Sequence, residues 1–435
     1  MNLDPVTIFG LILALFLFLM VFGAPIFAAL GVASILGIVL QAGVSGLTVV
    51  PEVLHRGLAS YSLISIPLFI LMGEVIARTS IGGKLFTMFL LWMNRVPGSL
   101  AVASIGSSAV FGAMSGVSVA GAATIGRVAI PEMLQRGYSP RLATGTVAAA
   151  GALALLIPPS IGFILYGEVA GQSIGRLFIA AVLPAVLVAG LMMLYVYVLC
   201  TVRKDMAPPD HLSRYTWRQR LKALREVWAV LLIVLLVLGT IYLGVATPTE
   251  AAGMGALGAF VVALIYGELS FRMILEIFRS TAVTSGMILL ILASALLFGY
   301  IMTRLMIPQK LVMMLAGVDQ PAWVLLTFIV LFLLVLGMFL DVVSVIVIST
   351  PILLPVIVAL GFSPIWFGVI MIITCEMAVI TPPVGLNLYV IKGIAPQVPL
   401  NDIIWGALPF VLVELLAIVI LAVFPEIALW LPGRL

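Results

Sequence analysis

The chain has 435 residues, of which 64% are hydrophobic and only 9% are charged, and its formal net charge is +4. Soluble domains carry about 25% charged residues, so this composition excludes a water-soluble globule and indicates a multi-pass membrane protein. The two cysteines lie in apolar segments, which argues against a disulfide framework or a zinc site. The basic residues are scattered, so membrane lipids are expected partners and nucleic acid is not.

Apolar segments of spanning length follow one another along the chain. A spanning helix needs about 20 mostly apolar residues. Breaks at glycine, proline and charged residues predict about ten spans, at 6–22, 26–45, 61–80, 141–172, 176–200, 226–244, 249–267, 282–303, 365–391 and 402–431.

Two further apolar stretches, 98–135 and 322–360, are interrupted near their centres, at 112–116 (GAMSG) and at 337–341 (GMFLD). Each stretch is either one long span or a re-entrant hairpin. If both are hairpins, the N-terminus lies outside and most lysines and arginines lie in the cytoplasm, as the positive-inside rule favours. The segment 203–225, which is rich in arginine and lysine with interleaved aromatic residues, then predicts a basic amphipathic connector on the inner leaflet. Binding of a protein partner by this segment is the alternative.

The second half of the sequence repeats features of the first. The segments 137–140 (GYSP) and 361–364 (GFSP) lie 224 residues apart, as do Pro158-Pro159 and Pro382-Pro383. These matches predict an all-α fold with one repeat at 1–202, the connector at 203–225 and a second repeat at 226–435. Each repeat is expected to hold about five transmembrane helices and one hairpin, near 98–135 and 322–360. An odd number of crossings inverts the second repeat, and inverted repeats with broken helices are typical of secondary transporters.

The two Pro-Pro pairs remove backbone hydrogen-bond donors within apolar segments. A proline leaves the carbonyl four residues earlier without its helical partner, so Pro158 frees the carbonyl of Ala154 and Pro382 frees that of Ala378. An unpaired carbonyl at membrane depth costs several kcal/mol unless it is satisfied. A small hard cation bound by oxygen atoms is one solution. A plain helix kink packed by small residues is the alternative.

Polar residues accompany these breaks. Hydroxyl and amide groups at Ser118, Ser160 and Asn387 are candidate substrate-binding groups, because they can form hydrogen bonds beside these breaks. Asp341, just after the second interruption, is expected to shape a hairpin tip, to bind an ion through water, or to take part in proton coupling. Other ionisable residues in apolar segments are weaker candidates, several being near expected water interfaces: Glu74, Arg127, Glu168, Glu250, Glu376 and Glu414.

Motifs of common enzymes are missing from the sequence. It contains no HExxH, GxSxG or GxxxxGK[ST] pattern, so a zinc protease, a serine hydrolase and a P-loop ATPase have no support. No organic cofactor is expected. A membrane-embedded enzyme and a passive channel remain weaker alternatives to a transporter.

Several motifs in order resemble the large membrane subunit of the tripartite ATP-independent periplasmic (TRAP) transporters. The resemblance covers nearly the whole chain and is carried by 65–74 (SIPLFILMGE), 111–116 (FGAMSG), 156–160 (LIPPS), 247–252 (TPTEAA) and 380–385 (ITPPVG). It implies an elevator-type secondary transporter of the ion-transporter superfamily in the bacterial inner membrane, with no enzymatic activity.

The resemblance also implies two sodium sites, made mostly of backbone carbonyls beside the hairpin tips and the Pro-Pro breaks. The first would involve Ser115, Ala154, Ile157 and Pro158, and the second Gly337, Ala378, Thr381 and Val384. The sequence departs from the family at 116–118 (GVS), where consecutive serines are common. A side-chain role at position 117 is therefore not expected.

In the resembled family, a sodium gradient drives the uptake of organic anions such as carboxylates or sialic acid. The expected partners are a small four-helix membrane subunit, here on a separate polypeptide, and a periplasmic substrate-binding protein. A stand-alone carboxylate symporter of the same superfamily, which needs neither partner, is the alternative.

Overall fold

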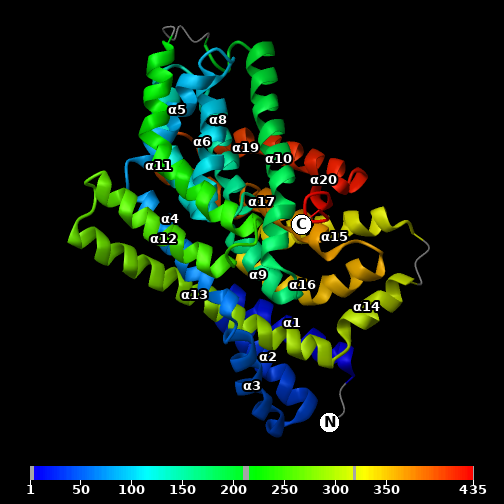
Figure 1. Cartoon of the computed structure of the whole chain (residues 1–435). Helices are drawn as coiled ribbons and strands as arrows, with labels where there is room; N and C mark the ends of the chain where they lie inside the picture. The colour runs from blue at the N-terminus through cyan, green and yellow to red at the C-terminus, as the bar shows by residue number, and fades with distance from the viewer. Residues whose placement is uncertain (1–3, 209–214, 317–319, 435) are drawn as a thin grey trace.

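The computed structural model describes residues 4–208, 215–316 and 320–434. All regular elements within these ranges are helices, shown in chain order from blue to red in Figure 1. The predicted all-α fold is confirmed for this part of the chain.

The N-terminal elements lie at the lower end of Figure 1 and rise to its opposite end at α5. Asp4 caps the first helix, since its carboxylate accepts a hydrogen bond from the Val6 N–H at 3.0 Å. The amphipathic helix α3 and the helix α5 lie between the predicted spans. The elements are α1 (Pro5–Val21), α2 (Ile26–Ala42), η1 (Val44–Thr48), α3 (Val49–Leu58), η2 (Tyr61–Ile64), α4 (Ser65–Ala77) and α5 (Ile81–Met93).

The next stretch begins with a helix pair and continues with a helix broken at the first Pro-Pro pair. We call residues 116–117 the first tip and residues 153–160 the first break. The elements are α6 (Ser99–Ser115), α7 (Ser118–Gln135), α8 (Pro140–Ala152), η3 (Leu153–Leu155), α9 (Ile161–Ala170) and α10 (Ile174–Val202).

Long helices connect the two halves. These are α11 (Trp217–Tyr242), α12 (Pro248–Ile265), α13 (Phe271–Arg304) and the shorter α14 (Ile307–Ala316). The structure differs from the expected 203–225 connector in one respect. Residues 217–225 are the first turns of α11, which continues without interruption to residue 242, and residues 209–214 lie outside the described ranges. A capping box between Thr216 and Gln219 fixes the start of this helix.

The last stretch has the same order of elements as the stretch that starts at α6. We call residues 338–341 the second tip and residues 380–385 the second break. The elements are α15 (Ala322–Gly337), α16 (Val342–Ala359), α17 (Pro364–Val379), α18 (Leu386–Ile394), α19 (Leu400–Val423) and α20 (Glu426–Leu429). The Pro158-Pro159 and Pro382-Pro383 bonds are both cis.

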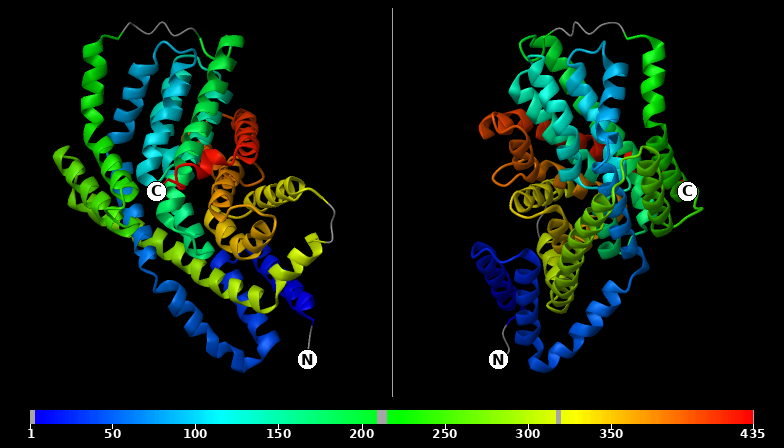
Figure 2. Two further views of the ribbon diagram at one scale, coloured as in Figure 1. Left: turned by 45° about the vertical axis from the view of Figure 1, so that its right-hand side comes forward. Right: turned by 90° about the vertical axis from the view of Figure 1, so that its left-hand side faces the viewer.

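The two stretches pack on each other reciprocally. Helix α18 of the last stretch packs on α7 of the first helix pair, and α9 packs on α16 of the second helix pair. Helix α19 also runs along α8. The orange and red helices of the last stretch accordingly lie against the cyan and green helices of the first in both views of Figure 2. The core that surrounds the two breaks is thus shared between the halves.

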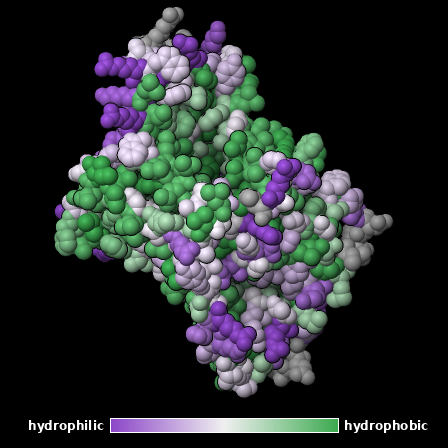
Figure 3. All heavy atoms as spheres, viewed as in Figure 1, coloured by the Kyte–Doolittle hydropathy of each residue, from purple (hydrophilic) through white to green (hydrophobic). Residues whose placement is uncertain are grey.

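The lengths and surfaces of the helices identify a multi-pass membrane protein. In the described residues, six helices are long and apolar enough to span a membrane, or seven if the bent pair 44–58 and 61–77 is one span. Two of the ten predicted spans, 141–172 and 365–391, are divided at their Pro-Pro pairs. Two others, 6–22 and 26–45, correspond to α1 and α2, which have only 17 residues each, whereas α16, which the sequence places in a hairpin, is long enough to span. Hydrophobic side chains also cover much of the outer surface in Figure 3, as contact with lipid requires.

Candidate functional site

The first tip and the first break are in direct contact. Helix α6 ends at Ser115, and Gly116 adopts a left-handed conformation with φ +59°, which reverses the chain. A Cβ atom on Gly116 would lie 2.9 Å from the carbonyl oxygen of Pro159. A Cβ atom on Gly112 would likewise lie 2.8 Å from the Cα atom of Ala154. Only glycine permits this close approach, so the glycines seen in the sequence bring the tip onto the break.

This contact gathers the four residues expected at the first sodium site. Ser115 and Ala154 are buried, and the Oγ of Ser115 has no hydrogen-bond partner among the described residues. Pro158 is buried and Ile157 is half-buried at the same break. A buried hydroxyl without a partner is costly, and its oxygen is free to bind a cation. The residues present therefore fit a sodium ion held by Ser115 and the backbone of the first break.

The second tip is tied to the second break in a corresponding way. The backbone N–H of Val384 donates a hydrogen bond to the Met338 carbonyl at 3.2 Å. A Cβ atom on Gly337 would lie 2.6 Å from the Cβ of Ala378. Gly337, Asp341 and Val384 line one pocket of about 210 Å³ beside this junction. Three of the four residues expected at the second sodium site are thus adjacent to each other.

Thr381, the fourth residue expected there, is buried at the second break. Its hydroxyl donates to the Met377 carbonyl in the last turn of α17. The donated proton leaves the lone pairs of the oxygen free, so this hydroxyl can still act as a cation ligand. The residues present fit a second sodium ion.

Asp341 caps a helix. Its carboxylate accepts hydrogen bonds from the N–H and the hydroxyl of Ser344, in the first turn of α16. Of the three roles considered for this residue, shaping the tip matches these contacts. Asp341 also lines the pocket beside Gly337.

The three residues expected at a substrate site, Ser118, Ser160 and Asn387, are all buried. Ser160 donates its hydroxyl proton to the Leu155 carbonyl within the first break, and Asn387 donates from Nδ2 to the Ala148 carbonyl of α8 at 3.0 Å. The Oδ1 atom of Asn387 has no partner among the described residues. Ser118 begins α7, the helix on which α18 packs. In this conformation Asn387 joins the two halves of the chain.

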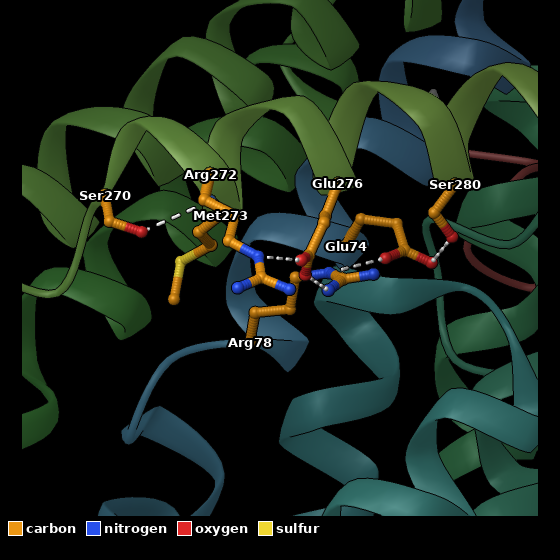
Figure 4. Close-up of polar contacts among 7 residues, drawn as sticks. All are labelled: Glu74, Arg78, Ser270, Arg272, Met273, Glu276 and Ser280. Atoms are coloured by element: carbon orange, nitrogen blue, oxygen red, sulfur yellow. Dashed lines mark hydrogen bonds and ion pairs between the residues drawn. The ribbon is translucent and has the colours of Figure 1, made fainter.

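Glu74 belongs to a network of ion pairs, shown in Figure 4. Its carboxylate accepts hydrogen bonds from Arg78 at 3.2 Å and from the Ser280 hydroxyl at 2.9 Å. Arg78 also pairs with Glu276 at 3.1 Å, and Glu276 pairs with Arg272 at 3.3 Å. These hydrogen bonds and ion pairs hold α4 against α13. The SIPLFILMGE motif thus ends on a residue with a structural role.

Glu250 caps a helix as well. Its carboxylate accepts from the N–H and the hydroxyl of Thr247, in a capping box that starts α12. Glu376 and Glu414 differ from Glu74 and Glu250, because both are fully buried and their carboxylate oxygens have no hydrogen-bond partner among the described residues. The sequence named both only as weaker candidates and did not distinguish them from the other glutamates, since only the packing of α17 and α19 places them away from water.

Comparisons with known proteins agree on one family. Residues 13–427 match the family described as "Tripartite ATP-independent periplasmic transporter, DctM component". The C4-dicarboxylate TRAP transporter large permease DctM of Pseudomonas aeruginosa is 34% identical over 86% of this chain and 87% of its own length. The sialic acid TRAP transporter large permease SiaM of Vibrio cholerae is 31% identical over 89% of this chain and 90% of its own length.

Two further similarities concern subunit organisation and fold. The isethionate TRAP transporter permease DctMQ of Oleidesulfovibrio alaskensis is 33% identical over 99% of this chain and 67% of its own length. The YdaH transporter of Alcanivorax borkumensis has a solved structure that covers 98% of each chain with a TM-score of 0.64 and 16% identity. This likeness shows a shared fold.

Proposed function

Because this chain belongs to the DctM family of tripartite ATP-independent periplasmic transporters, in which it is a large permease rather than an enzyme, we propose that it imports a small organic anion by sodium coupling. Its place is the bacterial inner membrane. The anion is of the carboxylate or sialic-acid type, and it crosses the membrane by an elevator movement of the part that carries both tips. The names of the relatives support the anion class, since they include C4-dicarboxylate and sialic acid permeases.

The observation that carries the proposal is the junction of each tip with its Pro-Pro break. Ser115, which precedes the Gly116 that contacts the first break, has a hydroxyl without a hydrogen-bond partner among the described residues. Val384 of the second break is hydrogen-bonded to Met338 of the second tip. Helix breaks that carry free oxygen atoms at two related places are suited to coupling ions. Sodium bound at these junctions would hold each tip closed against its break.

The proposed partners are a small four-helix membrane subunit and a periplasmic substrate-binding protein. The relative named DctMQ is longer than this chain, which covers 67% of it. A stand-alone symporter is the alternative. Uptake of labelled succinate and of labelled sialic acid into proteoliposomes, with and without both partners, separates the two: uptake by the chain alone would favour the symporter.

Sodium binding is tested without knowing the substrate. A ligand that binds only the folded state raises its stability, so the melting temperature of the purified full-length chain is measured in NaCl and in KCl at equal ionic strength. We expect a sodium-specific increase that is smaller in Thr381→Val. Equal melting temperatures in the two salts would contradict the proposed coupling ion.

A further inference from the structure

Three segments that carry basic residues meet at one end of the molecule. Gly98, in the loop after α5, packs on the end of α10, where an added Cβ atom would lie 2.7 Å from the Sγ of Cys200. Helix α11 packs on α5. The loop after α5, the residues after α10 and the first turns of α11 therefore lie side by side, at the upper end of Figure 1.

The lysines and arginines of these segments are exposed and have no acidic partner. Within the described residues of 203–226, the acidic side chains are Asp205 and Glu226. Neither these acids nor the bases belong to an ion pair between described residues. The result is a positively charged surface that the described chain does not neutralise. Its exposed bases are Arg95, Arg203, Lys204, Arg218, Lys222 and Arg225.

Arg220 adds a positive charge that is held in place at the contact of α5 with α11. Its Nη2 donates a hydrogen bond to the Oδ1 of Asn94 at 3.2 Å, and its guanidinium carbon lies 5.2 Å from the ring centroid of Trp217. Trp217 contacts Trp92 of α5 edge to face, with ring centroids 6.1 Å apart. Tryptophan rings are enriched at the headgroup level of membranes, so this contact favours a position at the membrane interface.

An exposed apolar stripe continues along α11 from the same place. Its members recur every three or four residues, which places them on one face of the helix. Each is about half exposed or more: Trp217, Leu221, Trp228, Leu232 and Leu235. In Figure 3, hydrophilic side chains accordingly gather at the upper end and hydrophobic ones lie below them.

The bases follow the same spacing on the neighbouring face and end where the apolar stripe continues. Arg218, Lys222 and Arg225 are four and three residues apart. The ten residues from Arg225 to Leu235 rise about 15 Å along the helix, which is half of the hydrocarbon core of a bilayer, about 30 Å. Charges at one end and apolar side chains over the depth of one leaflet match the shape and chemistry of a phospholipid.

We propose that the start of α11, together with the end of α5, binds an anionic phospholipid of the cytoplasmic leaflet. Arg218, Lys222 and Arg225 contact the phosphate and the rest of the charged headgroup, and the acyl chains lie along the stripe from Trp228 to Leu235. Clusters of bases next to a spanning helix attract anionic lipids, and each base changes the binding constant about fivefold. This assignment depends on neither the ion nor the substrate of the proposed function.

The test compares an anionic lipid with a neutral one. A ligand that binds only the folded state raises its stability, so the melting temperature of the purified full-length chain is measured in detergent against added dioleoylphosphatidylglycerol or dioleoylphosphatidylcholine. The salt is KCl throughout, so that sodium makes no contribution. We expect the anionic lipid to raise the melting temperature of wild type well beyond the neutral one, and the effect to weaken at high salt.

A triple variant removes the charges of the site. Arg218→Gln combined with Lys222→Gln and Arg225→Gln should weaken binding about 100-fold, so at least tenfold more phosphatidylglycerol is needed for half of the maximal rise. A control with the same loss of charge replaces the exposed bases Arg56, Arg176 and Arg434 by glutamine. It should keep the response of wild type.

A conservative variant checks that charge is the cause. Arg218→Lys with Arg225→Lys keeps both charges and should keep the response to phosphatidylglycerol. A wild-type response no larger for phosphatidylglycerol than for phosphatidylcholine, or an equal response in wild type and in the triple variant, would overturn the proposal.

Two further measurements distinguish other occupants of the surface. Glycerol phosphate has the headgroup charge without acyl chains, and a rise as large as that with phosphatidylglycerol would replace the lipid by a free anion. Co-purification with the small membrane subunit tests a protein partner. Loss of that subunit from the triple variant, with no effect of phosphatidylglycerol on wild type, would overturn the lipid site in favour of a protein contact.

Discussion

Gly145 of α8 and Gly406 of α19 are in direct backbone contact across the two halves of the chain. A Cβ atom on Gly145 would lie 2.1 Å from the carbonyl oxygen of Gly406, and one on Gly406 would lie 2.0 Å from the carbonyl oxygen of Arg141. The neighbouring ion pair between Arg141 and Asp402 sets the same register at 2.7 Å. This contact brings α19, and with it Glu414, against the helix that leads into the first break.

Gly145→Ala is therefore expected to destabilise the protein strongly. The added methyl group meets backbone atoms, which cannot rotate away, so the helices must separate. Overpacking of this kind costs about 1–3 kcal/mol or more. Melting temperature and yield of folded protein in detergent measure the effect. Gly190→Ala is the control, because nothing lies within 4 Å of a Cβ atom there, and an equal loss in both variants would contradict the argument.

Ser115→Ala and Thr381→Val are expected to weaken the sodium dependence of stability and uptake. Neither change should lower the stability in the absence of sodium appreciably. The Ser115 hydroxyl has no hydrogen-bond partner among the described residues, and that of Thr381 donates only to the nearby Met377 carbonyl at the end of α17. The measurement is the sodium concentration for half-maximal stabilisation or uptake.

Two controls match these variants closely. Ser108→Ala removes another buried hydroxyl of α6 that has no partner in the part of the chain that the structure describes. Thr374→Val removes a hydroxyl of α17 that donates to the Ile370 carbonyl at 2.8 Å. Both controls should keep the sodium response of wild type. Unchanged sodium activation in Ser115→Ala and Thr381→Val would refute the assigned sites.

Asp341→Asn should keep the transport rate, whereas Asp341→Ala should lose about 1 kcal/mol of stability. The reason is that Asp341 caps α16 through Ser344, and asparagine caps helices as well as aspartate does. Uptake and melting temperature of both variants check this. Loss of transport in Asp341→Asn at unchanged stability would show instead that the charge itself is needed, as in proton coupling.

Glu268 gives a pH-dependent contribution to stability. It lies in the loop between α12 and α13. Burial acts to raise its pKa, but hydrogen bonds from the Ser80 hydroxyl and N–H, together with the Lys84 charge, hold the pKa below its ordinary value of 4.5. A lowered pKa in the folded state means that the stabilisation is present above pH 4.5 and disappears as the pH falls through the lower folded-state value.

Glu268→Gln should accordingly lower the melting temperature modestly at pH 7, and the difference from wild type should shrink below pH 4.5. The partial exposure of this carboxylate keeps the effect small. Melting temperatures of both proteins between pH 7 and pH 4 give the result. A difference that grows towards acidic pH would have the wrong sign for this explanation.

The positions of tips and breaks could be predicted from the sequence, because they depend on local chemistry. Each Pro-Pro pair removes two successive backbone hydrogen-bond donors, and Gly116 reverses the chain with a positive φ, which favours the end of a helix near these residues.

The surroundings of the glutamates could not be predicted in this way. Glu74, Glu376 and Glu414 all look alike in sequence, as single acids in apolar segments. Glu74 accepts hydrogen bonds from Arg78 and Ser280, whereas the carboxylates of Glu376 and Glu414 have no hydrogen-bond partner among the described residues. The difference arises from which helices meet in space, and hydrophobic periodicity does not carry that information. Helices α3 and α14 were missed because their lengths and polarity do not suit a span.

The reciprocal packing of α18 on α7 and of α9 on α16 has a consequence for how the two halves evolve. A substitution on α18 changes the surface that contacts α7, although α18 and α7 lie far apart in the sequence. Substitutions at these contacts in one half therefore require compensating substitutions in the other half. Hybrid permeases that join the first half of one relative to the second half of another should fold less often than hybrids in which both helices of each contacting pair, α18 with α7 and α9 with α16, come from the same relative.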